Sequence, residues 1–398
     1  MILHAKLIEN DQIVTLHIDG EKISRIDPFT DRSEVERVDP ALYIAPGFFD
    51  PQVNGFAGVD FNGCDLTPED VHRAAQAISA TGVTIFFPTL ITTSFERLLH
   101  QLKILKEAIE NDPLVSKMCS GIHLEGPYIS SAEGPRGVHA VQFIRPPQWE
   151  EFERLQEACG GRIRLITLAP EKEGSLHFIE KAVSKGVVVA IGHTEASEEI
   201  LDAACEAGAR LSTHLGNGMG SNFPRHRNPF QKQLAMDGLM ASIIADGIHL
   251  PDYVVKNIVR SKTPERVLLC TDAISAAAQL PGKYRLADLE VEVEPDGRTR
   301  LVGTDSLAGS TLSMPKAIAN VIKFAGIDLR TAIKMATENG RKLFPEIIGT
   351  IAPNQPANLA VFRFDGEVKI EKTIVMGEEV WPNLNPKFQI SNPQPQSA

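Results

Sequence analysis

The sequence lacks the features that mark secreted, membrane-spanning and nucleic-acid-binding proteins. Only 5 of its 398 residues are cysteine, and they are scattered without CxxC spacing, which predicts reduced thiols and a cytoplasmic location. The N-terminal segment is charged and carries no long apolar core, so we expect no signal peptide, and no apolar run approaches membrane-spanning length. The formal net charge of −11 argues against nucleic acid as a partner.

The central region also lacks a Gly-x-Gly-x-x-Gly motif after its first strand-like run, which weakens a dinucleotide-binding interpretation. It has instead an alternation of apolar, strand-like runs with amphipathic, helix-like stretches. The strand-like runs are IAPGFFDPQVN, GVTIFFPTL, CSGIHLE, IRLITLAPE, VVVAIGH, ARLSTHL, ASIIADG and RVLLCTD. Eight such repeats in about 300 residues predict an α/β fold with a (β/α)₈ TIM-type barrel rather than an open doubly wound sheet.

The two ends of the chain have a different pattern from the middle. Short strand-like segments with Asp-Gly turns occupy residues 1–45 and return towards the C-terminus. We therefore predict a small β-sandwich domain built from residues 1–45 and 346–398, and a barrel domain over residues 46–345. Residues 276–313 are too long for a simple loop, and LEVEVEPDGRTRLVG within them predicts an inserted hairpin.

Four polar side chains stand at the C-terminal ends of predicted strands: Glu125, His193, His214 and Asp272. In a barrel these ends surround one active site. One carboxylate and two imidazoles suit one divalent metal, Zn²⁺ first, with Fe²⁺, Co²⁺ and Mn²⁺ also compatible. The fourth residue, Asp272, is placed to act as a general base. Each residue alone has a structural explanation, such as packing or capping a helix, but a metal requires the three ligands together.

Two absences favour a single metal. The first strand ends in Asp50-Pro51-Gln52-Val53-Asn54, with amides where a His-x-His pair would bind a second ion. The fourth strand ends in LAPEKEG, without a lysine at its terminus that could bridge two ions.

Loops after the strands supply candidates for substrate contact. His139 lies in GPRGVHA and His249 in ADGIHL. Arg227 lies beside Arg225 in PRHRNP, where an anion could be bound bidentately, although a loop arginine is more often a solvated charge. The turn LGNGMG, which contains Asn217 and Gly218, offers backbone N–H groups to a phosphate oxygen.

These segments together resemble the N-acetylglucosamine-6-phosphate deacetylase family of the amidohydrolase superfamily. The matching stretches cover nearly the whole chain in order: PGFFDPQVNG, PTLITTS, GIHLEGP, LAPE, IGHTEAS, THLGNGM, IIADGIHL, TDA, LAGSTLSM, MATENGRKLF and PANLAVF. The resemblance implies a metal bound by Glu125, His193 and His214, with Asp272 as the catalytic acid and base. His139 matches a family position that contacts the sugar or the reacting amide, and we expect it to assist catalysis. It also implies that Gln52 and Asn54 mark a single-metal branch.

The resemblance further implies a set of substrate-binding residues, some of which contact the sugar and others the phosphate. These are His139, His249, Asn217, Gly218, Arg227 and Met314, the last residue of LAGSTLSM. In the family the arginine serves the neighbouring subunit's site, which implies a homodimer.

The chain departs from the family at one turn. The family pattern Leu/Phe-Tyr-Asn-Ala-Met is replaced by Leu215-Gly216-Asn217-Gly218-Met219, and a longer following loop makes Arg225 an alternative to Arg227. The expected activity is removal of acetate from N-acetylglucosamine-6-phosphate. The alternatives are another N-acyl substrate, such as N-acetylgalactosamine-6-phosphate or an unphosphorylated compound, and an inactive sugar-phosphate-binding protein.

Overall fold

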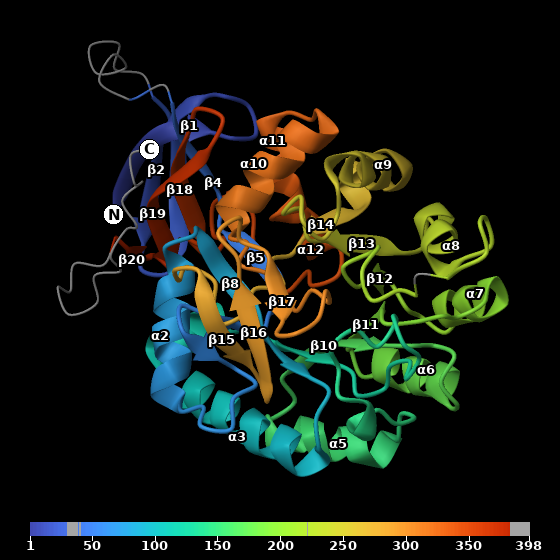
Figure 1. Cartoon of the computed structure of the whole chain (residues 1–398). Helices are drawn as coiled ribbons and strands as arrows, with labels where there is room; N and C mark the ends of the chain where they lie inside the picture. The colour runs from blue at the N-terminus through green and yellow to red at the C-terminus, as the bar shows by residue number, and fades with distance from the viewer. Residues whose placement is uncertain (30–38, 40, 221, 383–398) are drawn as a thin grey trace.

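The computed structural model describes residues 1–29, 39, 41–220 and 222–382. Its centre is a parallel barrel sheet of eight strands in the order β14-β13-β12-β11-β10-β9-β8-β5 (Figure 1). Their bounds are β5 Phe48–Val53, β8 Val83–Ile91, β9 Ile122–Glu125, β10 Ile163–Leu168, β11 Val188–Ile191, β12 Leu211–Ser212, β13 Met240–Ile243 and β14 Val267–Leu269. A parallel bridge between Val53 of β5 and Ala273, which follows β14, brings the two edges of the sheet together. All eight predicted strands and the barrel are thereby confirmed.

Helices follow the strands and cover the outside of the barrel (Figure 1). Their bounds are α2 Pro68–Ser79, α3 Phe95–Asn111, α4 Pro113–Met118, α5 Trp149–Ala158, α6 Ser175–Ser184, α7 Glu198–Glu206, α8 Pro229–Ala235, α9 Asp252–Lys262, α10 Met314–Ala325, α11 Leu329–Met335 and α12 Glu338–Arg341. Local chemistry fixes their starts: Thr67 caps α2 in a reciprocal capping box with Asp70, and Pro68 occupies the first turn. Their apolar faces pack on the strands.

A second sheet combines the two ends of the chain, as predicted. It has seven strands in the order β20-β19-β18-β4-β1-β2-β3, and Figure 1 shows its blue and red strands side by side. The bounds are β1 Ile2–Leu7, β2 Ile13–Asp19, β3 Lys22–Pro28, β4 Leu42–Pro46, β18 Leu359–Phe364, β19 Val368–Val375 and β20 Glu378–Trp381. The strand β4 lies between β1 and β18 and so joins the two ends. The final segment of the predicted small domain, 383–398, lies outside the described residues.

The insertion before α10 contains one more strand than the predicted hairpin. Strands β15 Gly282–Leu286, β16 Leu289–Val293 and β17 Thr299–Leu301 form an antiparallel sheet. Leu286 packs in a hydrophobic cluster with Ile91 at the end of β8 and Ile274 after β14. The insertion therefore forms a wall beside the carboxyl ends of the barrel strands. A short hairpin, β6 Gly55–Phe56 with β7 Val59–Asp60, follows β5.

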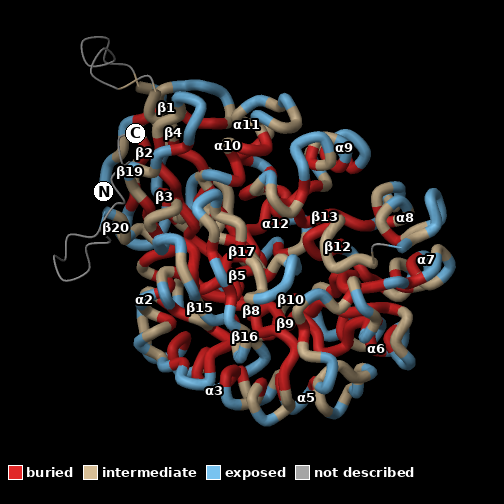
Figure 2. Tube along the Cα trace, viewed as in Figure 1, coloured by how far each residue is buried: buried red, intermediate tan, exposed pale blue. Residues whose placement is uncertain are grey.

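The two ends of the barrel differ in chemistry. Near the amino ends of the strands, Phe49, Phe87 and Phe344 pack edge to face with ring centroids 5.0–5.6 Å apart. The carboxyl ends instead carry buried polar side chains. Figure 2 shows that most of the barrel strands are buried, and Arg164 and Val188 are the strand residues of intermediate exposure. An active site in a barrel is expected at the carboxyl ends of the strands, and the buried polar side chains lie at this end. Within the described ranges, no helix combines the length and apolarity needed to span a membrane.

Candidate active site

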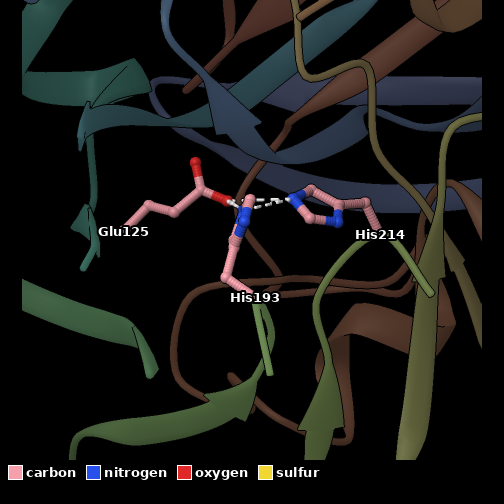
Figure 3. Close-up of side chains that lie close together, drawn as sticks. All are labelled: Glu125, His193 and His214. Carbon is pink, nitrogen blue, oxygen red and sulfur yellow. Dashed lines mark hydrogen bonds and ion pairs between the residues drawn. The ribbon is translucent and has the colours of Figure 1, made fainter. Parts of the chain in front are cut away.

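Glu125, His193 and His214 meet at the carboxyl end of the barrel, as predicted. They follow or end β9, β11 and β12, and Figure 3 shows their side chains pointing towards one another. The Oε1 atom of Glu125 lies 3.2 Å from Nε2 of His193 and 3.0 Å from Nε2 of His214, and the two nitrogens are 3.1 Å apart. All three residues are buried.

This triangle of atoms fits a metal ion. Ligand atoms bound tetrahedrally at about 2.0–2.1 Å from Zn²⁺ lie roughly 3.3 Å from one another, close to the separations found here. Burial opposes ionisation of Glu125, but the neighbouring His193 and His214 rings outweigh it and hold the pKa of the carboxyl well below its usual range. The Nδ1–H of His193 donates to the Pro135 carbonyl at 2.7 Å, which aims Nε2 at the triangle. The three residues can therefore hold one divalent cation.

The backbone at this end of the barrel is strained. Three site residues have positive φ values, which residues other than glycine rarely adopt. The values are 53° for His193, 29° for His214 and 52° for Asp272. Such conformations persist only where the surroundings hold them, and they concentrate at functional sites. Here they turn each side chain inwards directly after its strand.

Asp272 lies across the site and is 8% exposed. Its Oδ1 atom accepts hydrogen bonds from Nε2 of Gln52 at 3.0 Å and from Nδ2 of Asn54 at 2.7 Å. Burial, and then the negative charge of Glu125, raise the pKa of Asp272 to about 6. A carboxyl with a pKa near neutrality suits proton transfer in both directions.

Two further histidines line the same cavity. The Nδ1 atom of His139 is 2.8 Å from the Thr92 hydroxyl, and its ring packs against His193 with centroids 4.5 Å apart. Burial, and then the neighbouring His193, lower the pKa of His139 to about 3, so its ring is neutral at pH 7. The Nδ1–H of His249 donates to Asp246 at 2.7 Å, and the same carboxylate accepts two backbone N–H groups.

The turn after His214 contributes the other polar wall. Asn217 donates from Nδ2 to the His214 carbonyl at 3.1 Å. Gly218 has φ +59°, and a Cβ atom placed on it would lie 2.7 Å from Nδ1 of His193. Glycine at this position lets the turn approach the His193 ring.

A cavity of about 280 Å³ connects these groups. Polar residues line it together with apolar side chains from β8, the loop after β9, the segment after β13 and the insertion. The apolar residues are Ile91, Val138, Ile244, Leu286 and Leu307. A small ligand with a polar body and a short apolar group matches this mixed lining.

The other candidates lie away from the cavity. Arg225 and Arg227 are exposed, and Arg227 borders a separate surface depression beside Glu199 at the start of α7. Met314 is fully buried in the hydrophobic core at the start of α10. It packs in the barrel and does not line the cavity, so the structure gives no support to substrate contact by Met314.

Known proteins are similar to this chain over most of its length. Residues 43–380 match the amidohydrolase family. The chain belongs to this family. Two relatives called N-acetylglucosamine-6-phosphate deacetylase, from Bacillus subtilis and Bos taurus, are 30% and 32% identical over 329 and 355 residues. The alignments cover 82% of this chain and 82% of the bacterial relative, and 85% of this chain and 83% of the bovine one.

Among solved structures, the amidohydrolase resembles N-acetyl-D-glucosamine-6-phosphate deacetylase from Mycobacterium smegmatis. A variant of that enzyme, solved in complex with N-acetyl-D-glucosamine-6-phosphate, matches with a TM-score of 0.85 and 29% identity. The match covers 96% of this chain and 99% of the other. The family resemblance predicted from the motifs is thereby confirmed.

Sequence reasoning missed several residues of this amidohydrolase site. Asp246 in ADGIHL bonds to His249, and Thr92 in LITTS bonds to His139. Both could have been found as polar side chains close to a strand end. Gln52 and Asn54 were recognised only as poor metal ligands. Their hydrogen bonds to Asp272 link positions 220 and 218 residues apart, which no local pattern indicates.

Proposed function

We propose that this protein is a metal-dependent amide hydrolase that converts N-acetylglucosamine-6-phosphate into glucosamine-6-phosphate and acetate. The observation that carries the proposal is the buried triangle of Glu125, His193 and His214 with Asp272 across the same cavity. The similarity to deacetylases over more than four fifths of the chain supports the substrate class. Three residues that could bind a metal, with a further carboxylate that is not one of them, argue against a binder without catalytic function.

The metal and the protein have separate tasks. When bound, a divalent cation polarises a carbonyl oxygen and lowers the pKa of water near it. Asp272 accepts the proton of the water that attacks the acetamide carbon, and then delivers it to the nitrogen as the C–N bond breaks. We assign His139 the tautomer in which the Thr92 hydroxyl donates to Nδ1. Its Nε2–H then donates to the carbonyl oxygen as negative charge develops there.

The remaining contacts follow from the cavity lining. His249, Asn217 and Gly218 border the cavity and bind the sugar phosphate in this proposal. Arg227, which lies outside the cavity, serves the site of a second subunit, with Arg225 as the alternative. The active form is then a homodimer. Sedimentation of the wild type and of an Arg227→Ala variant, together with KM for the phosphorylated substrate, tests this: a monomer with unchanged KM would contradict it.

We infer Zn²⁺ as the metal, because two imidazoles and one carboxylate at short separations suit it, with Fe²⁺, Co²⁺ and Mn²⁺ as alternatives. We also propose a cytoplasmic location, which five unpaired cysteines support. Neither nucleic acid nor a membrane is part of the proposed function; the net charge of −11 is the reason for the first.

One experiment tests the activity. Acetate release is measured from N-acetylglucosamine, N-acetylgalactosamine and the 6-phosphates of both, with metal content determined on the same sample. We expect the highest kcat/KM for N-acetylglucosamine-6-phosphate. Equal rates with and without phosphate would favour another N-acyl substrate, since the turn at Gly216-Asn217-Gly218 lacks the aromatic residue of the family pattern. A metal-loaded protein that releases no acetate from any compound would overturn the proposal.

A further inference from the structure

Two amide side chains at the end of β5 contact the proposed proton acceptor. Both bond to the same atom: Gln52 Nε2 and Asn54 Nδ2 donate to Oδ1 of Asp272, at 3.0 and 2.7 Å. The amide orientations follow from chemistry, because an ionised carboxylate only accepts hydrogen bonds. Among the described residues, none donates a hydrogen bond to Oδ2 of Asp272.

Gln52 also connects Asp272 to the metal triad. Gln52 Nε2 donates a second hydrogen bond to Oε1 of Glu125 at 3.0 Å, the same oxygen that faces both histidines. One NH₂ group therefore spans the two carboxylates and offsets their mutual repulsion. The backbone is fixed as well, since Asp272 N–H donates to the Gln52 carbonyl at 3.0 Å.

Asn54 provides a second, independent observation. It is 3% exposed, lines the cavity, and its Oδ1 atom has no hydrogen-bond partner among the described residues. Leaving a buried carbonyl oxygen without a hydrogen-bond partner is unfavourable. In the opposite amide orientation the Asn54 oxygen would face the Asp272 carboxylate, and two acceptors would repel each other. The amide therefore keeps the orientation in which its N–H group donates to Asp272.

We propose that Gln52 and Asn54 are positioning residues that hold Asp272 by Oδ1, leaving Oδ2 as the atom that accepts and returns the proton. The inference rests on the proposed function for the role of Asp272. It assigns a task to the two amides at the position where other metal hydrolases of this architecture carry a His-x-His pair. Both residues act through Asp272 and need not touch the reacting atoms.

The test uses near-isosteric variants without N–H donors, Gln52→Met and Asn54→Leu, in the metal-loaded full-length protein. The control is Asn339→Leu, because Asn339 is a buried amide that donates two 2.7 Å hydrogen bonds to backbone carbonyls away from the cavity. We expect kcat to fall roughly 10- to 100-fold in each amide variant, as for a misplaced catalytic group. KM and metal content stay within about 2-fold of wild type, whereas Asn339→Leu loses thermal stability and keeps kcat.

A crystal structure of Asn54→Leu separates this inference from the proposed activity. We expect the metal triad unchanged and the Asp272 carboxylate rotated or in two conformations, whether or not acetate is released. An unmoved Asp272 would overturn the inference. So would a loss of metal in proportion to the loss of activity, because the amides would then serve the metal site.

Discussion

At the scale of single residues, the Asp272 carboxylate receives both of its amide hydrogen bonds on Oδ1, and the residue lines the cavity. The metal triad does not include it. In the proposed mechanism, metal binding and proton transfer are therefore carried by different side chains, and each can be removed separately.

Asp272→Asn should retain the metal and lose nearly all turnover. The amide keeps the size of the side chain but cannot accept a proton, and general-base catalysis contributes about 10²- to 10⁴-fold. Acetate release and metal content on one sample measure both effects. Retained turnover would show that Asp272 is not the general base.

His193→Ala should instead lose the metal together with the activity, because two ligands cannot replace three. A chelator should lower the Tm of the wild type, since a ligand present at 100 times its Kd stabilises the fold by about 2.7 kcal/mol. It should leave the Tm of His193→Ala unchanged. The control is His177→Ala, an exposed histidine on α6. A full metal complement in His193→Ala would contradict the triad.

At the scale of elements, the turn between His214 and α8 is shaped by its contact with the His193 ring. Gly218 combines φ +59° with a close approach to Nδ1 of His193. The turn and the His193 ring therefore cannot be altered independently, which accounts for a small residue at a position that borders the cavity.

Gly218→Ala should destabilise the protein by about 1–2 kcal/mol through backbone strain and should also weaken metal binding by displacing His193. Gly238→Ala is the matched control, because an added Cβ there meets no atom within 4 Å. Urea unfolding and metal titration of both variants measure the effects. Equal metal affinity in the two variants would show that the turn does not constrain the ring.

At the scale of the whole molecule, a buried carboxyl group on the first barrel strand forms hydrogen bonds to the segment that follows the last strand. Asp50 on β5 accepts hydrogen bonds from the hydroxyl and backbone N–H of Thr271, at 2.6 and 3.2 Å. Burial raises the pKa of Asp50 to about 7, from an ordinary value of 3.8, despite these bonds. Asp50 therefore links the stability of the barrel to pH.

The sign follows from proton uptake. Between pH 4 and 7 the folded state holds a proton on Asp50 that the unfolded state has lost, so the free energy of unfolding falls as pH rises. The slope from one group is at most about 1.4 kcal/mol per pH unit. Asp50→Asn should flatten this dependence, which urea unfolding at pH 5, 6, 7 and 8 can measure. Parallel curves for the variant and the wild type would contradict the prediction.

The sequence by itself determined the barrel, the sheet that combines both ends of the chain, and the positions of the four strand-end residues. Apolar periodicity is local, and parallel strands in a barrel direct their carboxyl ends to one place whatever their separation along the chain. Tertiary structure alone decided which loop and core residues reach the cavity. It buried Met314, left Arg225 and Arg227 outside, and placed both amides of β5 on Asp272. Those contacts depend on side chains that meet across the barrel mouth, and no local pattern encodes such meetings.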